Sequence, residues 1–428
     1  MPPRRTLLLL CALFVWFNAG VEEWRLGHWG EIAEHPARIL WPPWQPLRAY
    51  VSRESDERLY FQYSRLILGE EPDLDYLARK RQGDPEKNRR ELAPLIRQGP
   101  GMRMPYRDFP LEYPPLPVAL MLLPRLVASS LAAYRVAFGA QMALVFLLLA
   151  LVAGRLGETA QVWKRMGWLA LAIGPILCSR LDLLPALLVA AALLALDRRR
   201  DVLCGALFGL AILAKLYPAL LMLPLIALLR RRSLKIAAAA AVTGLLASLP
   251  FLIAAPRAFL QSVALYGARP FQIESLPGGL ILALRGKEAV IGSFGSYNAA
   301  TPPALAALAD VLFWGSLAAL AAAAALRGGQ VKRWMAAVLA LILCTSKVLS
   351  PQYLIWLLPF PALLPDLFRW SIVACALTQA YYPFLYDPLL DAQPLVVLVL
   401  LLRNAALVVL AVRAVRGASA PAVAPGMV

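Results

Sequence analysis

The chain has 428 residues, of which 60% are hydrophobic and only 16% are charged, and its mean hydropathy is +0.63. These values lie outside the range of soluble globular domains and within that of polytopic membrane proteins. The formal net charge of +17 does not indicate a nucleic-acid partner, because the basic residues stand in short clusters between apolar runs rather than along one face of a soluble domain.

Apolar segments predict an all-α polytopic membrane protein with about twelve crossings. Several segments are shorter than the roughly 20 residues of a full span, so we expect some helices to tilt, to be extended by polar flanks or to be re-entrant. The first segment follows a basic start but has no cleavage site before VEEW, which favours a retained helix over a signal peptide. The segments lie at roughly 5–20, 131–154, 166–178, 183–197, 202–214, 217–229, 236–254, 303–326, 334–346, 351–364, 370–385 and 393–413.

Short clusters of Lys and Arg predict which helix ends face the cytoplasm. With both termini inside, the short outer turns hold only Arg180, Lys215 and Lys347. The long segments 21–130 and 255–302 then lie outside. The cytoplasmic side receives Arg4, Arg5, Arg155, Lys164, Arg165, Arg198, Arg199, Arg200, Arg230, Arg231, Arg232, Lys235, Arg327, Lys332, Arg333, Arg369, Arg413 and Arg416.

Two stretches of the first outer segment predict amphipathic helices that lie along the membrane interface. In DERLYFQYSRLILG, apolar or aromatic residues stand at 59, 60, 63, 66 and 67, which is a helical period. In EYPPLPVALMLLPRLVASSL, Pro114 and Pro115 suit the first turn of a helix. Reading this second stretch as a crossing would put the cationic turn 155–165 outside, against the charge rule.

Asp56 directly precedes the first of these helices and has two interpretations. A carboxylate at this place can cap a helix N-terminus. It can also act as a general base that takes a proton from an acceptor hydroxyl. The residues around Asp56 do not decide between the two.

The cations of the three outer turns suggest a binding site, because a charge at membrane depth is costly without a partner or ligand. Arg180 could pair with Asp182, and a lysine could extend to water. Three cations on one face, with Arg257 and Arg269 in the second outer segment, favour an anionic head group such as a lipid phosphate. Aromatic residues near this face could form an interfacial belt or stack on sugar rings; they are Tyr106, Tyr113, Tyr217, Tyr266, Tyr353 and Trp356.

The chain shows no pattern specific for a metal or cofactor, and we expect neither. His28 and His35 lack metal-binding spacing, and the five cysteines lie in or beside apolar segments without a CxxC pair. Asp56, Asp108 and Glu112 could together form a carboxylate site, but nothing specifies one. No P-loop or Rossmann glycine pattern follows a strand, so a cytosolic nucleotide sugar is not the expected donor.

Five strings in order, over roughly residues 50–365, together resemble glycosyltransferase family 87, also described as domain of unknown function 2029. The strings are YRDFPLEYPPL at 106–116, SRLDLLPALL at 179–188, GLAILAKLYPALL at 209–221, FQIESLPGGL at 271–280 and SPQYLIWLLPF at 350–360. The resemblance implies a GT-C-type bundle, with residues 1–415 as one domain and 416–428 as a flexible tail. It also implies a polyprenyl-phosphate-linked sugar, above all mannose, as donor.

The resemblance further implies metal-independent, inverting transfer to a hydroxyl of a lipid or glycan acceptor. Asp56 stands where the family carries its acidic residue and would be the base, with Asp108 and Glu112 as alternatives. A charged insertion at 71–103 departs from the family's compact loop and could be a lid, a partner surface or a solvated loop. The expected substrate-binding residues are Tyr106, Arg107, Asp108, Glu112, Tyr113, Arg180, Asp182, Lys215, Tyr217, Arg269, Gln272, Glu274, Lys347, Gln352 and Tyr353.

A multi-pass transporter or lipid-linked-sugar flippase is the alternative, since many helices with polar groups at their ends would suit one. The chain has no evident duplicated half, and its polar groups cluster on one side rather than near the midplane, which argues against it. We expect the protein to be integral to a bacterial inner or plasma membrane, surrounded by lipids, with an extracytoplasmic active site.

Overall fold

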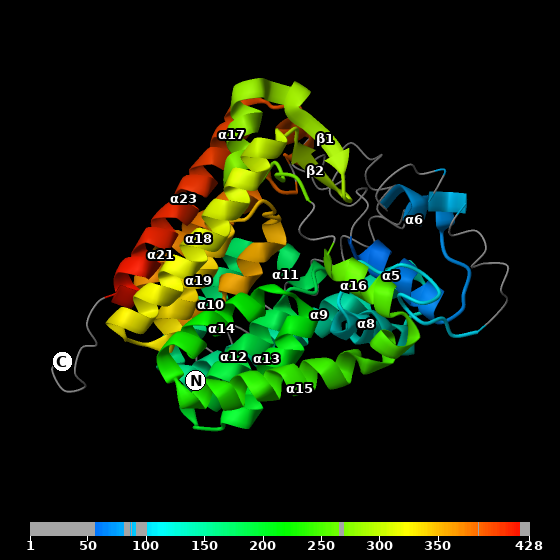
Figure 1. The fold of residues 1–428 in the computed structure, drawn as a ribbon. Coiled ribbons are helices and arrows are strands. Elements are labelled where there is room, and N and C mark those ends of the chain that lie inside the picture. The colour runs from blue at the N-terminus through cyan, green and yellow to red at the C-terminus, as the bar shows by residue number, and fades with distance from the viewer. Residues whose placement is uncertain are drawn as a thin grey trace.

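The computed structural model describes residues 56–80, 86, 88–90, 101–264, 269–383 and 385–419. The crossing expected at 5–20, both histidines, Tyr266 and much of the charged insertion lie outside the described residues. The described part is mainly helical (Figure 1), as the apolar segments predicted.

Four helices are long and apolar enough to cross a membrane: α9 (Leu131–Leu156), α15 (Arg231–Ala254), α18 (Pro303–Arg327) and α23 (Pro394–Ser419). Each coincides with an expected segment. α9 begins where the Ser130 side chain accepts a hydrogen bond from the Ala133 N–H, which satisfies one of the helix's unpaired donors. α23 continues to Ser419, so the first residues of the expected tail are helical.

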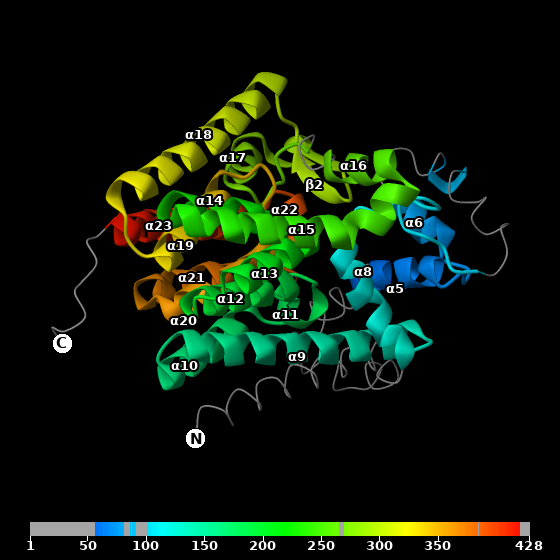
Figure 2. The same ribbon diagram turned by 60° about the horizontal axis from the view of Figure 1, so that its bottom comes forward.

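α15 and α18 present most of their surface outward. The apolar window of α15 is 17% buried and that of α18 is 11% buried, and Figure 2 shows α18 along one edge of the bundle. Such apolar surface suits contact with lipid. Its largest exposed side chains include Val242, Leu245, Leu246, Val311, Leu312 and Trp314.

Shorter helices fill the bundle, and at about 1.5 Å per residue they fall short of a hydrocarbon core about 30 Å thick. The count of about twelve crossings therefore stays a prediction. One of them, α13, approaches the long helix α15 closely at Gly205, where a Cβ would stand 2.2 Å from the Ile236 carbonyl oxygen of α15. The short helices are α10 (Thr159–Ile173), α11 (Ile176–Ser179), α12 (Leu183–Asp197), α13 (Asp201–Ala214), α14 (Tyr217–Leu229), α19 (Val331–Thr345), α20 (Pro359–Leu363), α21 (Pro365–Tyr381) and α22 (Tyr386–Leu390).

The segment expected as a crossing at 351–364 is instead broken into a 3₁₀ helix, η3 (Pro351–Leu357), and α20. Pro351, Pro359 and Pro361 explain the break, because proline removes a backbone donor and crowds the preceding turn. The segment is largely buried inside the bundle, where other protein groups can satisfy irregular backbone at membrane depth.

The second long outer segment contains two strands, a departure from a purely helical chain. After α16 (Pro256–Ala264), α17 (Leu276–Arg285) and the 3₁₀ helix η2 (Gly286–Ala289), strands β1 (Val290–Ser293) and β2 (Ser296–Ala299) pair antiparallel, with Val290 opposite Ala299. Figure 1 shows this hairpin at the far end of α23 from Ser419.

The first long outer segment contains α5 (Asp56–Ile67), α6 (Leu74–Lys80), α8 (Pro115–Leu122) and the 3₁₀ helix η1 (Leu123–Leu126). α8 starts at its prolines, as predicted. The expectation that α5 lies along the interface stays a prediction. α5 packs on the N-terminal part of α9 (Figure 2), with Tyr60 against Phe138 and Phe61 against Tyr134. Even its polar Gln62 and Ser64 are buried.

Ion pairs bring the basic helix ends together at one end of the bundle. Lys332 at the start of α19 lies 2.6 Å from Asp197 at the end of α12. Arg333 lies 3.1 Å from Asp366 at the start of α21. Likewise, Arg232 of α15 pairs with Asp201 of α13 at 2.6 Å. This common end is the one that the charge rule assigns to the cytoplasm.

Candidate functional site

Asp56 and Arg180 form an ion pair that joins the first outer segment to the turn before α12. Asp56 is the first residue of α5, rather than the residue before it. Arg180 also donates a hydrogen bond from Nη2 to the hydroxyl of Tyr382, at 2.7 Å. The side chain of Asp56 is 29% exposed and that of Arg180 is 12% exposed, so the carboxylate is accessible while the guanidinium is largely shielded.

Asp182 pairs with Lys215, not with Arg180. Its Oδ1 lies 3.1 Å from Nζ of Lys215 and accepts a hydrogen bond from the indole N–H of Trp356 at 2.6 Å. The Asp182 side chain is only 3% exposed. The partner suggested by the sequence, Arg180, points instead to α5, so the two carboxylates of this region each hold a different cation.

Three aromatic rings stack beside Lys215. The ring of Trp356 lies 4.2 Å from that of Tyr217 and 4.0 Å from that of Tyr353, both nearly parallel. Two rings at this spacing must cover opposite faces of the indole, which leaves Trp356 no open face for a sugar. Tyr353 is only partly buried, and its ring centroid is 5.2 Å from the Lys215 ammonium, which favours a cation–π contact.

The stretch 104–113 folds into a turn closed by its own side chains. Asp108 accepts hydrogen bonds from Arg107 at 2.7 Å and from the Met104 N–H at 2.7 Å. The hydrogen bond from Arg107 is the main reason why the pKa of Asp108 lies below its usual value, and the bond from the Met104 N–H acts in the same direction. Tyr106 donates a hydrogen bond to the Tyr113 carbonyl oxygen at 2.5 Å. A carboxylate held this way is a weaker base than an ordinary aspartate.

Tyr113 connects this turn to α5, since its ring packs edge-on against Tyr60 at 5.6 Å. Burial raises the pKa of the Tyr60 hydroxyl well above its usual value, and the nearby Tyr113 and Asp182 raise it further. The hydroxyl of Tyr60 therefore stays protonated beside the Asp182–Lys215 pair. Glu112 is partly buried.

Glu274 lies in a second polar cluster, directly before α17, and is 1% exposed. Its Oε1 accepts a hydrogen bond from the Tyr386 hydroxyl at 2.6 Å, and its main-chain oxygen accepts one from Arg403 at 2.7 Å. Burial raises the pKa of Glu274 to about 7. Arg403 is fully buried in α23 and also donates to the Tyr381 hydroxyl at 2.9 Å.

The two clusters meet at a tyrosine turn between α21 and α22. Tyr382 accepts the hydrogen bond from Arg180, its ring packs edge-on against Tyr386 at 5.3 Å, and Tyr386 donates to Glu274. Sequence reasoning missed Tyr381, Tyr382 and Tyr386. The available signal was the string YYPFLYDP at 381–388, where three tyrosines flank a proline at the end of a predicted crossing.

The remaining expected site residues mainly hold the loops together. Arg269 donates to the Phe294 carbonyl oxygen of the hairpin turn at 2.7 Å. Lys347 pairs with Asp310 of α18 at 2.9 Å, and its carbonyl oxygen accepts the Gln272 N–H at 2.9 Å. Gln352 accepts a hydrogen bond from Ser350. Over residues 56–80, 101–264, 269–383 and 385–419, no three His, Cys, Asp or Glu side chains gather as a metal-binding group would require.

The family model of glycosyltransferase family 87 matches residues 111–351, more than half of the chain. The chain belongs to glycosyltransferase family 87. No curated protein and no solved structure matches it. The matched range begins later than the motif resemblance, which began near residue 50. Arg180, Asp182 and Lys215 lie within the matched range, whereas Asp56 and the turn at 106–108 lie before it.

In this family 87 glycosyltransferase, the geometry therefore offers one accessible carboxylate, Asp56, beside a shielded guanidinium, Arg180. Next to them stand a buried carboxylate–ammonium pair and an aromatic stack. Such an arrangement can take a proton from a hydroxyl and stabilise negative charge that develops on a leaving group.

Proposed function

We propose that this family 87 enzyme transfers a sugar, mannose in the first instance, from a polyprenyl-phosphate donor to a hydroxyl of a lipid or glycan acceptor. Transfer would invert the anomeric configuration and take place on the extracytoplasmic face. The observation that carries the proposal is the ion pair between Asp56 and Arg180, which holds an accessible base beside a cation.

In the proposed reaction, Asp56 takes the proton of the acceptor hydroxyl as that oxygen bonds to the anomeric carbon. The bond between this carbon and the phosphate oxygen breaks, and its electrons leave with polyprenyl phosphate. Arg180 stabilises the charge that develops on the phosphate. Arg180 is paired with Asp56, so a donor phosphate that binds Arg180 would compete for the guanidinium and leave the carboxylate to the acceptor.

Lys215 is the second candidate for the phosphate. Its ammonium is held 3.1 Å from Asp182, and an ammonium forms strong, charge-assisted hydrogen bonds with phosphate oxygens. The partly buried ring of Tyr353 lies beside it and offers a surface for a sugar. Asp182 would position Lys215 rather than react itself, because Lys215 and Trp356 surround its carboxylate.

The topology that we propose places both termini and the basic helix ends in the cytoplasm, in a bacterial inner or plasma membrane. The Asp56–Arg180 pair would then lie outside, where a polyprenyl chain can stay in lipid while its phosphate reaches the cations. Membership of a glycosyltransferase family favours this enzyme over a transporter or flippase.

The test uses purified protein in lipid, labelled mannose on polyprenyl phosphate, and membrane extract as the source of acceptor. We expect the wild type to transfer label, and Asp56→Asn to bind donor but to transfer roughly 100- to 10,000-fold more slowly, the range for loss of a general base. Asp391→Asn, which removes an exposed carboxylate paired with Lys287, is the matched control and should keep activity.

Equal transfer by the wild type and Asp56→Asn would reject Asp56 as the base. Asp108→Asn and Glu112→Gln are then the next variants. If the wild type transferred nothing from any polyprenyl-phosphate sugar, the donor class would be wrong.

A further inference from the structure

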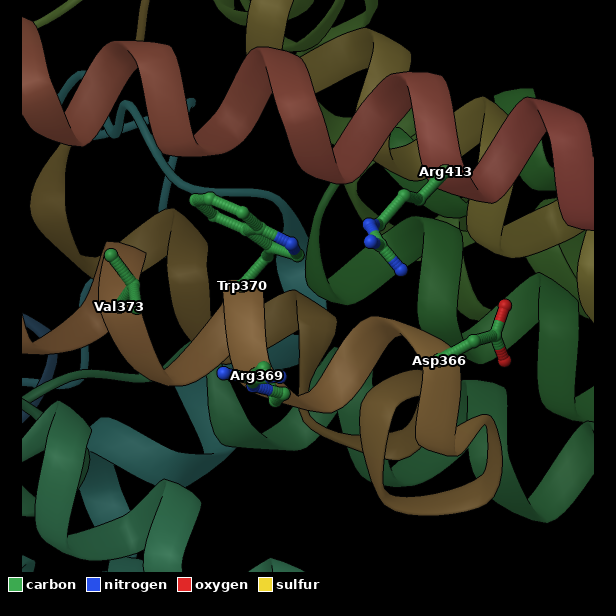
Figure 3. A pocket seen from close by; sticks show the side chains of 5 residues that line it. All are labelled: Asp366, Arg369, Trp370, Val373 and Arg413. Atoms are coloured by element: carbon green, nitrogen blue, oxygen red, sulfur yellow. The ribbon is translucent and has the colours of Figure 1, made fainter.

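A second concave site lies between α21 and α23, among the basic helix ends. Its cavity has a volume of about 230 Å³ and is lined by Asp366, Arg369, Trp370 and Val373 of α21 and by Arg413 of α23. In Figure 3, Arg413 extends from α23 toward α21, and Trp370 extends from α21 toward α23. We call these five residues the α21–α23 pocket. It belongs to the end of the bundle that lies away from the Asp56–Arg180 pair.

The pocket is lined by two positive side chains and one negative side chain. Asp366 is already engaged by Arg333 at 3.1 Å. Arg369 and Arg413 are exposed, and neither forms an ion pair with any residue that the structure describes. Two guanidinium groups at one cavity repel each other, and an anion between them would remove that repulsion. The planar guanidinium binds phosphate oxygens by paired hydrogen bonds.

An apolar surface continues from these arginines along α21. Arg369, Val373, Ala376 and Ala380 are all exposed, and their spacing of three to four residues puts them on one face of the helix. The indole of Trp370 lines the cavity beside them, as is common for tryptophan at the boundary between head groups and acyl chains. A ligand that fits both parts has a phosphate at one end and a hydrocarbon chain at the other.

We propose that the α21–α23 pocket binds an anionic phospholipid, with its phosphate between Arg369 and Arg413 and an acyl chain beside Val373. The proposal does not depend on the donor or the reaction proposed above, because the pocket shares no residue with that site. The lipid would join the same two helices that Tyr381 and Arg403 join next to Glu274.

The test measures binding of phosphatidylglycerol and phosphatidylcholine to detergent-purified protein by native mass spectrometry. We expect phosphatidylglycerol to bind the wild type more tightly, and the double variant Arg369→Gln/Arg413→Gln to lose roughly 30-fold in affinity for it, taking the usual gain per arginine near an anionic lipid. The matched control is Arg327→Gln/Arg416→Gln, which removes two exposed arginines outside the pocket and should bind like the wild type.

An equal loss in both double variants would overturn the proposal, because general surface charge would then explain binding. Inorganic phosphate that competes at the same concentration as phosphatidylglycerol would also overturn it, since the acyl chain would contribute nothing. A second experiment uses only the wild type, so that a variant that fails to fold cannot affect its result. A photoactivatable phosphatidylglycerol should label peptides from 365–381 and 394–419, and labelling only elsewhere rejects the site.

Discussion

Arg180 forms an ion pair with Asp56 and not with Asp182, although Asp182 stands only two residues farther along the chain. The backbone at residues 180–182 explains which carboxylate Arg180 pairs with. Arg180 has extended backbone, with φ −131° and ψ 146°, while Asp182 begins the turn into α12. The two side chains therefore leave the chain in different directions, and Arg180 meets the first turn of α5.

In the reaction proposed above, replacing Arg180 by glutamine should slow transfer by about 100- to 1,000-fold, because the leaving phosphate would lose a fixed cation. Arg180→Lys should recover part of this loss, since it keeps the charge without the planar guanidinium. Tyr382→Phe, which removes only the hydroxyl that Arg180 donates to, should slow transfer much less. The measurement is kcat/KM for the donor. Wild-type kinetics in Arg180→Gln would assign the phosphate to another cation, Lys215 first.

Replacing Asp182 by alanine should destabilise the protein by about 3 kcal/mol, because it leaves Lys215 without its ion-pair partner in a mostly buried place. The indole N–H of Trp356 would lose its acceptor in the same step. The check is the thermal unfolding midpoint in detergent, which should fall clearly. Asp391→Ala breaks the solvent-exposed pair with Lys287 and should leave the midpoint unchanged. Equal effects of the two substitutions would contradict the argument.

The sequence predicted the long helices well because their length and boundaries are local properties. The apolar run of α9 is longer than a membrane span, and Ser130 at its start is a favourable cap. The segment at 351–364 is also apolar, but its prolines break it into η3 and α20, and apolar composition alone does not reveal such a break. The packing of α5 on α9 depends on Tyr60 and Phe61 finding rings of another helix, which periodicity does not reveal.

The candidate site was only partly predictable for a related reason. The sequence predicted Asp56, Arg180 and Lys215 as site residues because charged residues are rare beside apolar segments and are easily recognised there. Their pairing could not be derived, since sequence shows neighbours along the chain and not across helices. Arg403 illustrates the limit: one of its partners is a main-chain oxygen, that of Glu274, and no residue type marks such an acceptor.

The contact of α13 with α15 should tolerate no side chain at Gly205. A Cβ there would stand 2.2 Å from the Ile236 oxygen and 2.7 Å from the Ala239 Cβ, so Gly205→Ala should destabilise by about 1–3 kcal/mol through overpacking. Gly244→Ala is the control, because a Cβ at Gly244 in α15 meets nothing within 4 Å and alanine favours helix. The comparison is again by thermal unfolding, and a neutral Gly205→Ala would show that the helices can separate.

Glu274 should make stability depend on pH in a direction opposite to that of most carboxylates. Its pKa in the folded protein is raised by burial to about 7, from a usual value of 4.5. Between these two values the unfolded chain releases the proton while the folded protein keeps it. The contribution of Glu274 to the free energy of unfolding therefore falls as pH rises from about 4.5 to about 7, by roughly 3 kcal/mol in all, and this contribution changes no further above that range.

Glu274→Gln isolates this effect, since an amide keeps an acceptor for the Tyr386 hydroxyl but cannot ionise. Relative to the wild type, the variant should gain stability steadily between pH 5 and pH 7. Glu288→Gln removes an exposed carboxylate from the same outer segment and should follow the wild type at every pH. The measurement is the thermal unfolding midpoint across this range in one detergent. Parallel curves for wild type and Glu274→Gln would mean that Glu274 is already ionised in the folded protein, paired with the buried charge of Arg403.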